Sequence, residues 1–253
     1  MSARVLPFLH LHRLCGAFLL LAFLAGEQTL ASPGDARLTA RPGQPTEPFA
    51  PGLTDLGLAR KRDGFVYVPS NYDPRHPAPL LVLLHGAGGS AKRAWTAYAK
   101  MAEPRGLIVL AIDSRWRTWD AIQHRWGDDV TFIDAALAHV FARHRIDPAQ
   151  VALAGFSDGA SYALSLGAAN GDLFTHVVAF APASIRPVLP RGQPRIFISH
   201  GTRDDILSVE LSRRGIVPTL RQAGYDVTYR ETDLGHEVDW DISIEMLTWF
   251  LGR

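Results

Sequence analysis

The chain has 253 residues, a length that suits one large α/β domain with a substantial hydrophobic core. Hydrophobic residues make up 47% of the sequence and charged residues 20%, and the formal net charge is only +1. This balance gives no electrostatic reason to expect nucleic acid or a strongly acidic molecule as a partner. Local motifs, rather than bulk charge, must therefore indicate the function.

Residues 1–31 have the pattern of a secretory signal peptide. Arg4 and Arg13 supply positive charge, an apolar stretch covers residues 14–25, and small residues end the segment. The apolar stretch is shorter than the roughly 20 residues that a membrane-spanning helix needs. The sequence therefore predicts a periplasmic or secreted protein without stable membrane insertion after cleavage. Cys15 is the only cysteine, so the mature chain would hold no disulfide.

Residues 32–52 are rich in Pro and Gly without a hydrophobic period, which predicts a flexible linker before a folded domain at 53–253. Within that domain, apolar runs of strand length alternate with segments of helical spacing. Strands are expected at 65–68, 80–84, 107–112, 151–154, 176–180, 196–199 and 227–229. Helices are expected at 90–102, 130–145, 160–166 and 242–251. This alternation predicts an α/β fold with a mainly parallel central sheet and helices on both faces.

The pentapeptide Gly155-Phe156-Ser157-Asp158-Gly159 lies between the expected strand at 151–154 and the expected helix at 160–166. A G-x-S-x-G sequence at a strand-to-helix turn is typical of a nucleophile elbow. The two glycines leave room for a strained turn that lifts the Ser157 hydroxyl clear of the sheet edge. The alternative is a Gly-rich turn in which Ser157 only caps the helix.

Polar residues also follow three other predicted strands, at the edge where an α/β sheet binds its ligands. They are His85-Gly86-Ala87-Gly88-Gly89, the segment from His200 to Asp205, and Leu234-Gly235-His236. A serine hydroxyl needs a base to take its proton, and a histidine such as His236 suits this task near neutral pH. Asp204 or Asp205 could orient that histidine. The order Ser, Asp, His along the chain is the one expected for α/β-hydrolases.

Two backbone amides are expected to hold the oxyanion that forms during acyl transfer. One belongs to Asp158, which directly follows Ser157. The other should come from the glycine-rich loop, and Ala87 is the candidate because its glycine neighbours let the backbone approach a substrate closely.

The stretch from Arg145-Ile146-Asp147-Pro148 through Gly155-Phe156-Ser157-Asp158-Gly159-Ala160 to Ala169-Asn170-Gly171-Asp172 resembles the bacterial phospholipase/carboxylesterase group. That group belongs to the α/β-hydrolases and lies near the feruloyl esterases and polyhydroxyalkanoate depolymerases. The resemblance spans roughly residues 64–250 and implies Asp204 as the triad acid, His236 as the base and Ala87 as an oxyanion residue. Asp205 stands where relatives often have proline, which keeps the choice of acid open. The family uses no cofactor, so none is expected.

The stretch Gly86-Ala87-Gly88-Gly89-Ser90-Ala91 also fits a dinucleotide fingerprint, with Asp113 as the ribose-binding acid. That interpretation gives Ser157 and its partners no purpose, so the hydrolase is favoured. A metal site is not expected, because there is no His-Glu-x-x-His run. His85 and His200 are expected to shape their turns through hydrogen bonds.

Two features bear on the substrate. The stretch at 181–194 is too short for a cap domain, which predicts an open site. Trp116, Trp119 and Trp126 lie among arginines after the strand at 107–112, and they predict a wall that binds an aryl acyl group or a sugar chain. The alternative is that these tryptophans pack the loop onto the domain.

Together these residues predict an exported serine hydrolase that cleaves small or oligomeric carboxylic esters through an acyl-enzyme. One alternative is a polymer- or ligand-binding protein on a hydrolase fold that cuts nothing. Another is a thioesterase or peptidase, because the sequence does not distinguish acyl leaving groups.

Overall fold

The structure is a computed structural model that describes residues 36–252 apart from 97 and 124. The predicted signal peptide, residues 1–31, lies outside the described residues. The strands are β1 (Gly52–Asp55), β2 (Gly64–Val68), β3 (Ala78–Leu84), β4 (Ile108–Ile112), β5 (Ile146–Phe156), β6 (His176–Phe180), β7 (Arg195–Gly201) and β8 (Val227–Thr232). The α-helices are α1 (Ala91–Thr96), α2 (Ala99–Ala102), α3 (Asp120–Gln123), α4 (Asp128–Arg143), α5 (Asp158–Ala169), α6 (Val217–Gln222) and α7 (Trp240–Leu251). A 3₁₀ turn (Glu103–Arg105) follows α2, and a π-helical segment (Leu211–Ile216) leads into α6.

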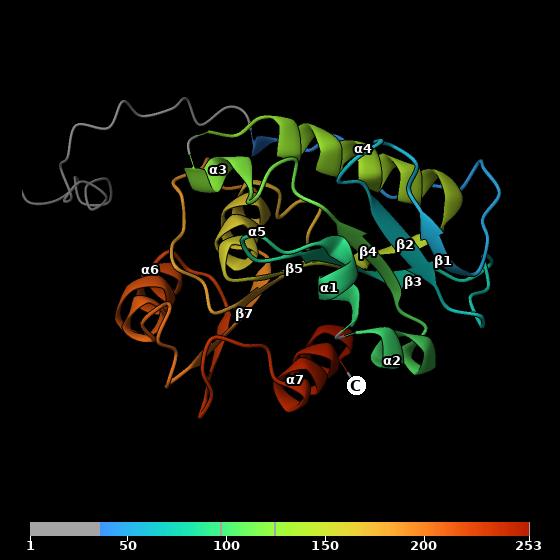
Figure 1. The fold of residues 1–253 in the computed structure, drawn as a ribbon. Coiled ribbons are helices and arrows are strands. Elements are labelled where there is room, and N and C mark those ends of the chain that lie inside the picture. Colours follow the sequence, from blue (N-terminus) through green and yellow to red (C-terminus); the bar gives the residue numbers. More distant parts are fainter. Residues whose placement is uncertain (1–35, 97, 124, 253) are drawn as a thin grey trace, which may run out of the picture. The chain divides into compact units, whose positions relative to one another are not determined.

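The strands form one sheet in the order β1-β2-β4-β3-β5-β6-β7-β8 (Figure 1). Strands β3 to β8 run parallel, whereas β1 and β2 pair antiparallel at one edge. The sequence does not predict β1, α3 or α6, each of which has four to six residues. Among the described residues, no helix combines the length and the apolar character needed to cross a bilayer.

Side chains alternate along the central strands and fill a core on each face of the sheet. On β3, Leu80, Val82 and Leu84 belong to one core, and Leu81 and Leu83 belong to the other. Helices α4, α5 and α6 cover the first face, and α1, α2 and α7 cover the second (Figure 1). A strand buried on both faces is a continuous apolar run, which explains why the sequence predicts β3.

The segment that joins β6 to β7, residues 181–194, contains neither a helix nor a strand. It therefore adds no cap domain over the sheet. The predicted fold class is confirmed as a mainly parallel α/β-hydrolase sheet with helices on both faces, and no cap domain is evident among the described residues.

The structure differs from the predicted flexible linker at 32–52, because this segment lies against the domain from Ala36 onward. Leu38 is fully buried, and its amide donates to Asn170 Oδ1 at 2.9 Å. Further hydrogen bonds join Thr39 to Asp134, and the amides of Thr46 and Glu47 to the carbonyl of Ala142. The Pro- and Gly-rich composition hides these contacts, because long-range hydrogen bonds rather than a hydrophobic period hold the extended chain. The folded domain therefore begins by residue 36.

Candidate active site

The sharp turn between β5 and α5 carries Ser157. Its backbone has φ 57° and ψ −120°, a strained conformation that non-glycine residues rarely adopt. Gly155 and Gly159 make the turn possible, since a Cβ on Gly155 would lie 2.1 Å from Gly159 O. A Cβ on Gly159 would lie 2.5 Å from Leu84 O. This elbow presents the Ser157 hydroxyl at the carboxyl edge of the sheet.

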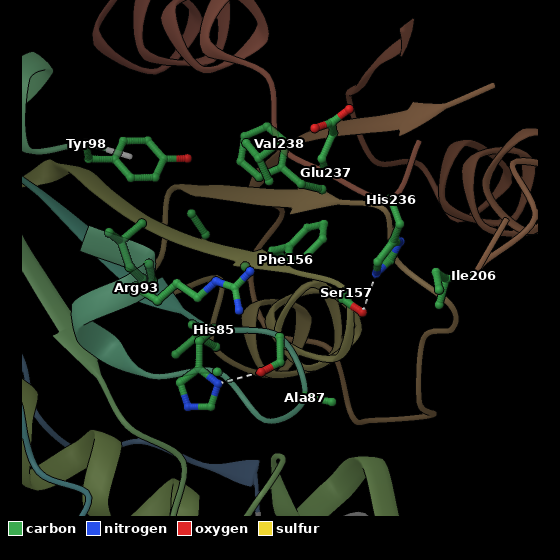
Figure 2. Close-up of a pocket in the computed structure, with 18 residues that line it drawn as sticks. His85, Ala87, Arg93, Tyr98, Phe156, Ser157, Ile206, His236, Glu237 and Val238 are labelled. Carbon is green, nitrogen blue, oxygen red and sulfur yellow. Dashed lines mark hydrogen bonds between the residues drawn. The ribbon is translucent and has the colours of Figure 1, made fainter. Parts of the chain in front are cut away.

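The structure brings Ser157, His236 and Asp204 together. Nε2 of His236 lies 3.0 Å from Ser157 Oγ (Figure 2), and Nδ1 of His236 lies 2.7 Å from Asp204 Oδ2. Asp205 is exposed, and its side chain makes no hydrogen bond or ion pair within the described part of the chain. The geometry therefore selects Asp204, rather than Asp205, as the partner of His236.

The carboxylate of Asp204 is held by its own turn. The side chain is fully buried, and Oδ1 accepts hydrogen bonds from the amides of Ile206 at 3.0 Å and Leu207 at 2.8 Å. Burial by itself would raise the pKa of Asp204, but the hydrogen bonds from Leu207 N and His236 outweigh burial and lower it. Asp204 is therefore ionised at neutral pH and can stabilise an imidazolium at His236.

A second histidine, His200, lies behind Asp204 at the end of β7. Its side chain is buried, with Nε2 2.8 Å from Leu207 O and 3.2 Å from Asp204 Oδ2. Nδ1 lies 2.8 Å from Ser212 Oγ. Because Nε2 must carry a proton to bond the Leu207 carbonyl, the same N–H also faces Asp204. His200 thus shapes its turn, as predicted, and in addition touches the acid.

The glycine-rich loop after β3 lies beside the serine. A Cβ on Gly86 would lie 3.2 Å from Ser157 Cβ, so the loop backbone packs directly against the elbow. Ala87 lines the same cavity as Ser157 (Figure 2). Asp158 begins α5, where the first N–H groups have no partner within the helix and favour negative charge. The two predicted oxyanion amides therefore belong to segments that adjoin Ser157.

His85 holds the glycine-rich loop from behind. The amide of Ser114 donates to His85 Nε2 at 3.0 Å, so the proton lies on Nδ1, which donates to Gly86 O at 2.7 Å. Burial lowers the pKa of His85, in keeping with this neutral ring. The side chain shapes its turn as the sequence predicts.

The structure corrects the predicted aromatic wall. Trp119 is fully buried, and its indole N–H donates to His85 O at 2.8 Å. Trp126 is also buried and packs on Tyr162, with ring centroids 5.0 Å apart. Trp116 is 66% exposed, but none of the three tryptophans lines the cavity at Ser157. Trp119 and Trp126 therefore pack the loop onto the domain, where burial of their large apolar surfaces stabilises it.

Two carboxylates, of the buried Asp129 and the half-buried Asp120, anchor this same loop between β4 and α4. Asp129 accepts hydrogen bonds from the amides of Arg115 and Asp120, both at 2.6 Å. Asp120 in turn accepts from the amide of Asp129 at 2.9 Å. Burial raises the pKa of Asp129 to about 6 despite these hydrogen bonds. These hydrogen bonds hold Arg115 and Asp120 against the start of α4, and neither residue lines the cavity at Ser157.

A cavity of about 520 Å³ opens in front of Ser157. Its walls are formed by the elbow, the glycine-rich loop and mostly apolar side chains. The sequence does not mark several of its lining residues: Arg93, Tyr98, Ile206, Glu237 and Val238. No motif identifies them, because they come from separate segments that only the fold brings together. Within the described ranges, no group of three or more His, Cys, Asp or Glu residues is arranged to hold a metal ion.

Comparison with known proteins identifies the family. A family model described as "Putative esterase" matches residues 57–215. The chain belongs to this esterase family. An acetylxylan esterase of Coprinopsis cinerea is 32% identical over 132 residues, covering 48% of this chain and 35% of that protein. A probable acetylxylan esterase A of Aspergillus clavatus is 26% identical over 174 residues, covering 64% of this chain and 54% of that protein. The chain thus matches about a third to a half of the length of these curated esterases.

Solved esterase structures share the fold at lower sequence identity. The crystal structure of esterase PE8 has a TM-score of 0.61 at 20% identity, covering 79% of this chain and 99% of that one. A ferulic acid esterase of Anaeromyces mucronatus, in complex with ferulic acid, has a TM-score of 0.58 at 17% identity. The match covers 85% of this chain and 97% of that one. Likeness at these identities concerns the fold alone. The family match adds the esterase relationship, so the predicted α/β-hydrolase esterase group is confirmed.

Proposed function

We propose that the protein hydrolyses carboxylic esters through a covalent acyl-enzyme. The observation that carries this proposal is the hydrogen-bond chain from Ser157 through His236 to Asp204. The strained elbow under Ser157 and the membership of an esterase family support it. Among known chemistries, this order of groups fits acyl transfer to a serine.

In the first half of the proposed reaction, Ser157 Oγ attacks the ester carbonyl carbon while His236 Nε2 takes the hydroxyl proton. The amides of Ala87 and Asp158 hold the negative charge that forms on the carbonyl oxygen. Asp204 keeps His236 oriented and stabilises its positive charge. The bond to the alcohol then breaks, and the alcohol leaves with the proton from His236.

Water completes the cycle. It adds to the acyl carbon as His236 takes one of its protons, and the bond from that carbon to Ser157 Oγ then breaks. His236 returns the proton to Ser157, and the carboxylic acid is released. The reaction consumes one water molecule for each ester and needs no other reactant.

The names of the matched relatives guide the choice of substrate. They are named for acetylxylan and ferulic acid, so acetyl and feruloyl esters are the first natural classes to test. The buried positions of Trp119 and Trp126 remove the argument that an aromatic wall selects aryl acids.

Export is a further part of the proposal. The charge and apolar pattern of residues 1–31 supports cleavage and release into the periplasm or the medium. Cell fractionation followed by N-terminal sequencing tests it: we expect the exported protein to begin close to Ser32. Full-length protein confined to the cytoplasm would contradict it.

Hydrolysis of p-nitrophenyl acetate, butyrate and octanoate, by wild type and Ser157→Ala, tests the reaction. We expect turnover by the wild type and a loss of about 10⁶ in kcat for the variant, as for other serine triads. Equal rates for the two proteins would contradict the proposal. A matched thioester and anilide separate the thioesterase and peptidase alternatives, and binding of an ester without turnover would favour the binding-protein alternative.

A further inference from the structure

We propose that Arg93 binds a negatively charged group on the acyl part of the substrate, so that the protein prefers esters of acids that carry a second carboxylate. This inference rests on the proposed ester hydrolysis and names its substrate class.

Arg93 is placed for a ligand rather than for the fold. It lies on α1, directly after the glycine-rich loop, and its guanidinium reaches into the cavity toward Ser157 (Figure 2). The residue is exposed, and its side chain makes no hydrogen bond or ion pair within the described part of the chain. Arg213 and Arg230, in contrast, pair with carboxylates. The guanidinium of Arg93 therefore keeps its donors available in the cavity that also holds the nucleophile.

The other cavity side chains do not compensate this charge. Arg93 is the only Lys or Arg among the described residues that line the cavity. Burial lowers the pKa of His85 and raises that of Tyr98, which keeps both side chains neutral. Glu237 is the one carboxylate in the lining, and its side chain points away from both Arg93 and Ser157 (Figure 2).

The floor of the cavity is apolar. It includes Leu83, Ala154 and Phe180, which belong to the sheet. A cation that faces a mostly apolar cavity favours a ligand with an apolar chain and an anionic end. A carboxylate fits the guanidinium best, since its two oxygens can accept two parallel N–H bonds.

The proton transfer in the proposed reaction places Arg93 on the acyl side of Ser157. His236 must give its proton to the departing alcohol oxygen, so the alcohol lies on the His236 side of Ser157. Figure 2 shows Arg93 and His236 on opposite sides of Ser157, with Ile206 beyond His236. The acyl chain therefore extends toward Arg93, and Ile206, which is 67% exposed, faces the leaving alcohol.

The test compares p-nitrophenyl pentanoate with p-nitrophenyl monoglutarate, whose acyl chains are equally long and differ by a terminal carboxylate. We measure kcat/KM for wild type, Arg93→Gln and Lys92→Gln, and subtract the rate with Ser157→Ala because a free carboxylate can cleave its own ester. Lys92 is the matched control, since it is exposed on the same helix and does not line the cavity.

We expect the glutarate-to-pentanoate ratio of kcat/KM to fall about fivefold in Arg93→Gln, the size of effect expected for a solvent-exposed ion pair. The ratio should stay unchanged in Lys92→Gln. Because the pair is exposed, the preference of the wild type should also weaken as salt rises from about 0.05 M to about 0.5 M.

Three other outcomes would contradict either the role of Arg93 or the proposed ester hydrolysis. Equal ratios in wild type and Arg93→Gln, with pentanoate still hydrolysed, would overturn the inference and leave the proposed function standing. If the glutarate-to-pentanoate ratio fell equally in Lys92→Gln, the preference would come from the overall electrostatic field of the protein. That result would overturn a direct contact between Arg93 and the substrate. A wild type that hydrolyses neither ester faster than Ser157→Ala would contradict the proposed function itself.

Discussion

The neighbouring carboxylates at positions 204 and 205 have different surroundings. Asp204 is buried and bonded to His236, while Asp205 is exposed. The sequence alone leaves the choice between them open, because both lie within reach of the same strand end. Only the turn that places the amides of Ile206 and Leu207 on one carboxylate decides it.

We expect Asp204→Asn to lower kcat on p-nitrophenyl butyrate by about 10⁴, the loss known for the serine-protease triad when the acid becomes an amide. The amide no longer holds His236 in the tautomer that accepts the serine proton. Asp205→Asn is the matched control, and its kcat should stay close to that of the wild type. A loss in Asp205→Asn equal to that in Asp204→Asn would reject the assignment.

At the scale of elements, the turn between β5 and α5 is possible because the backbone at Gly155 packs directly against the backbone at Gly159. The added Cβ of Gly155→Ala would lie 2.1 Å from a backbone oxygen, so the elbow would have to open. We expect the free energy of unfolding in urea to fall by about 3 kcal/mol or more, as for severe overpacking.

Gly215→Ala is the matched control for that substitution, because a Cβ there would meet nothing within 4 Å. We expect it to change the free energy of unfolding by less than about 1 kcal/mol. If the two glycine variants were equally stable, the close contact at the elbow would not be a determinant of the fold.

Elements that leave local signatures could be predicted from the sequence. The parallel strands are continuous apolar runs, and the elbow is a pentapeptide with its glycines in place. The loop between β4 and α4 leaves no such signature. Its tryptophans look alike in sequence, yet the carboxylates of Asp120 and Asp129 fold the loop so that Trp119 is buried and Trp116 is exposed.

At the scale of the whole molecule, the packing of the segment before β1 has a consequence for stability. His144 is buried against Phe49 and Tyr72, with ring centroids 5.8 and 5.9 Å away. Its Nε2 has no hydrogen-bond partner among the described residues. Burial, with smaller effects from His139 and Arg143, lowers the pKa of His144 to about 4. The contact between Phe49 and His144 joins residues far apart in the sequence, so the local composition of residues 32–52 does not reveal it. Composition alone therefore suggests a free linker.

The lowered pKa predicts that acid destabilises the protein. An unfolded histidine takes up its proton near pH 6.5, whereas His144 in the folded state does so near pH 4, so the stability contribution is present above about 6.5 and lost as pH falls toward 4. From about pH 7.5 to about pH 5, this one group should lower the free energy of unfolding by about 2 kcal/mol.

His144→Phe keeps the aromatic contacts and removes the titration. We measure the free energy of unfolding in urea for both proteins at about pH 7.5 and about pH 5. The difference between variant and wild type should shift by about 2 kcal/mol in favour of the variant at the lower pH. His176, whose pKa burial also lowers to about 4, titrates in both proteins and cancels from the comparison. Parallel losses of stability in the two proteins would show that His144 is not the group responsible.

The central claim, that Ser157 is an activated nucleophile, is tested most directly by covalent labelling. The purified protein is treated with a fluorophosphonate, and the adduct is located by mass spectrometry of its peptides. We predict a single adduct on Ser157 in the wild type, much slower labelling in His236→Ala because the base is missing, and none in Ser157→Ala. An adduct on another residue, or an unlabelled wild type, would contradict the account.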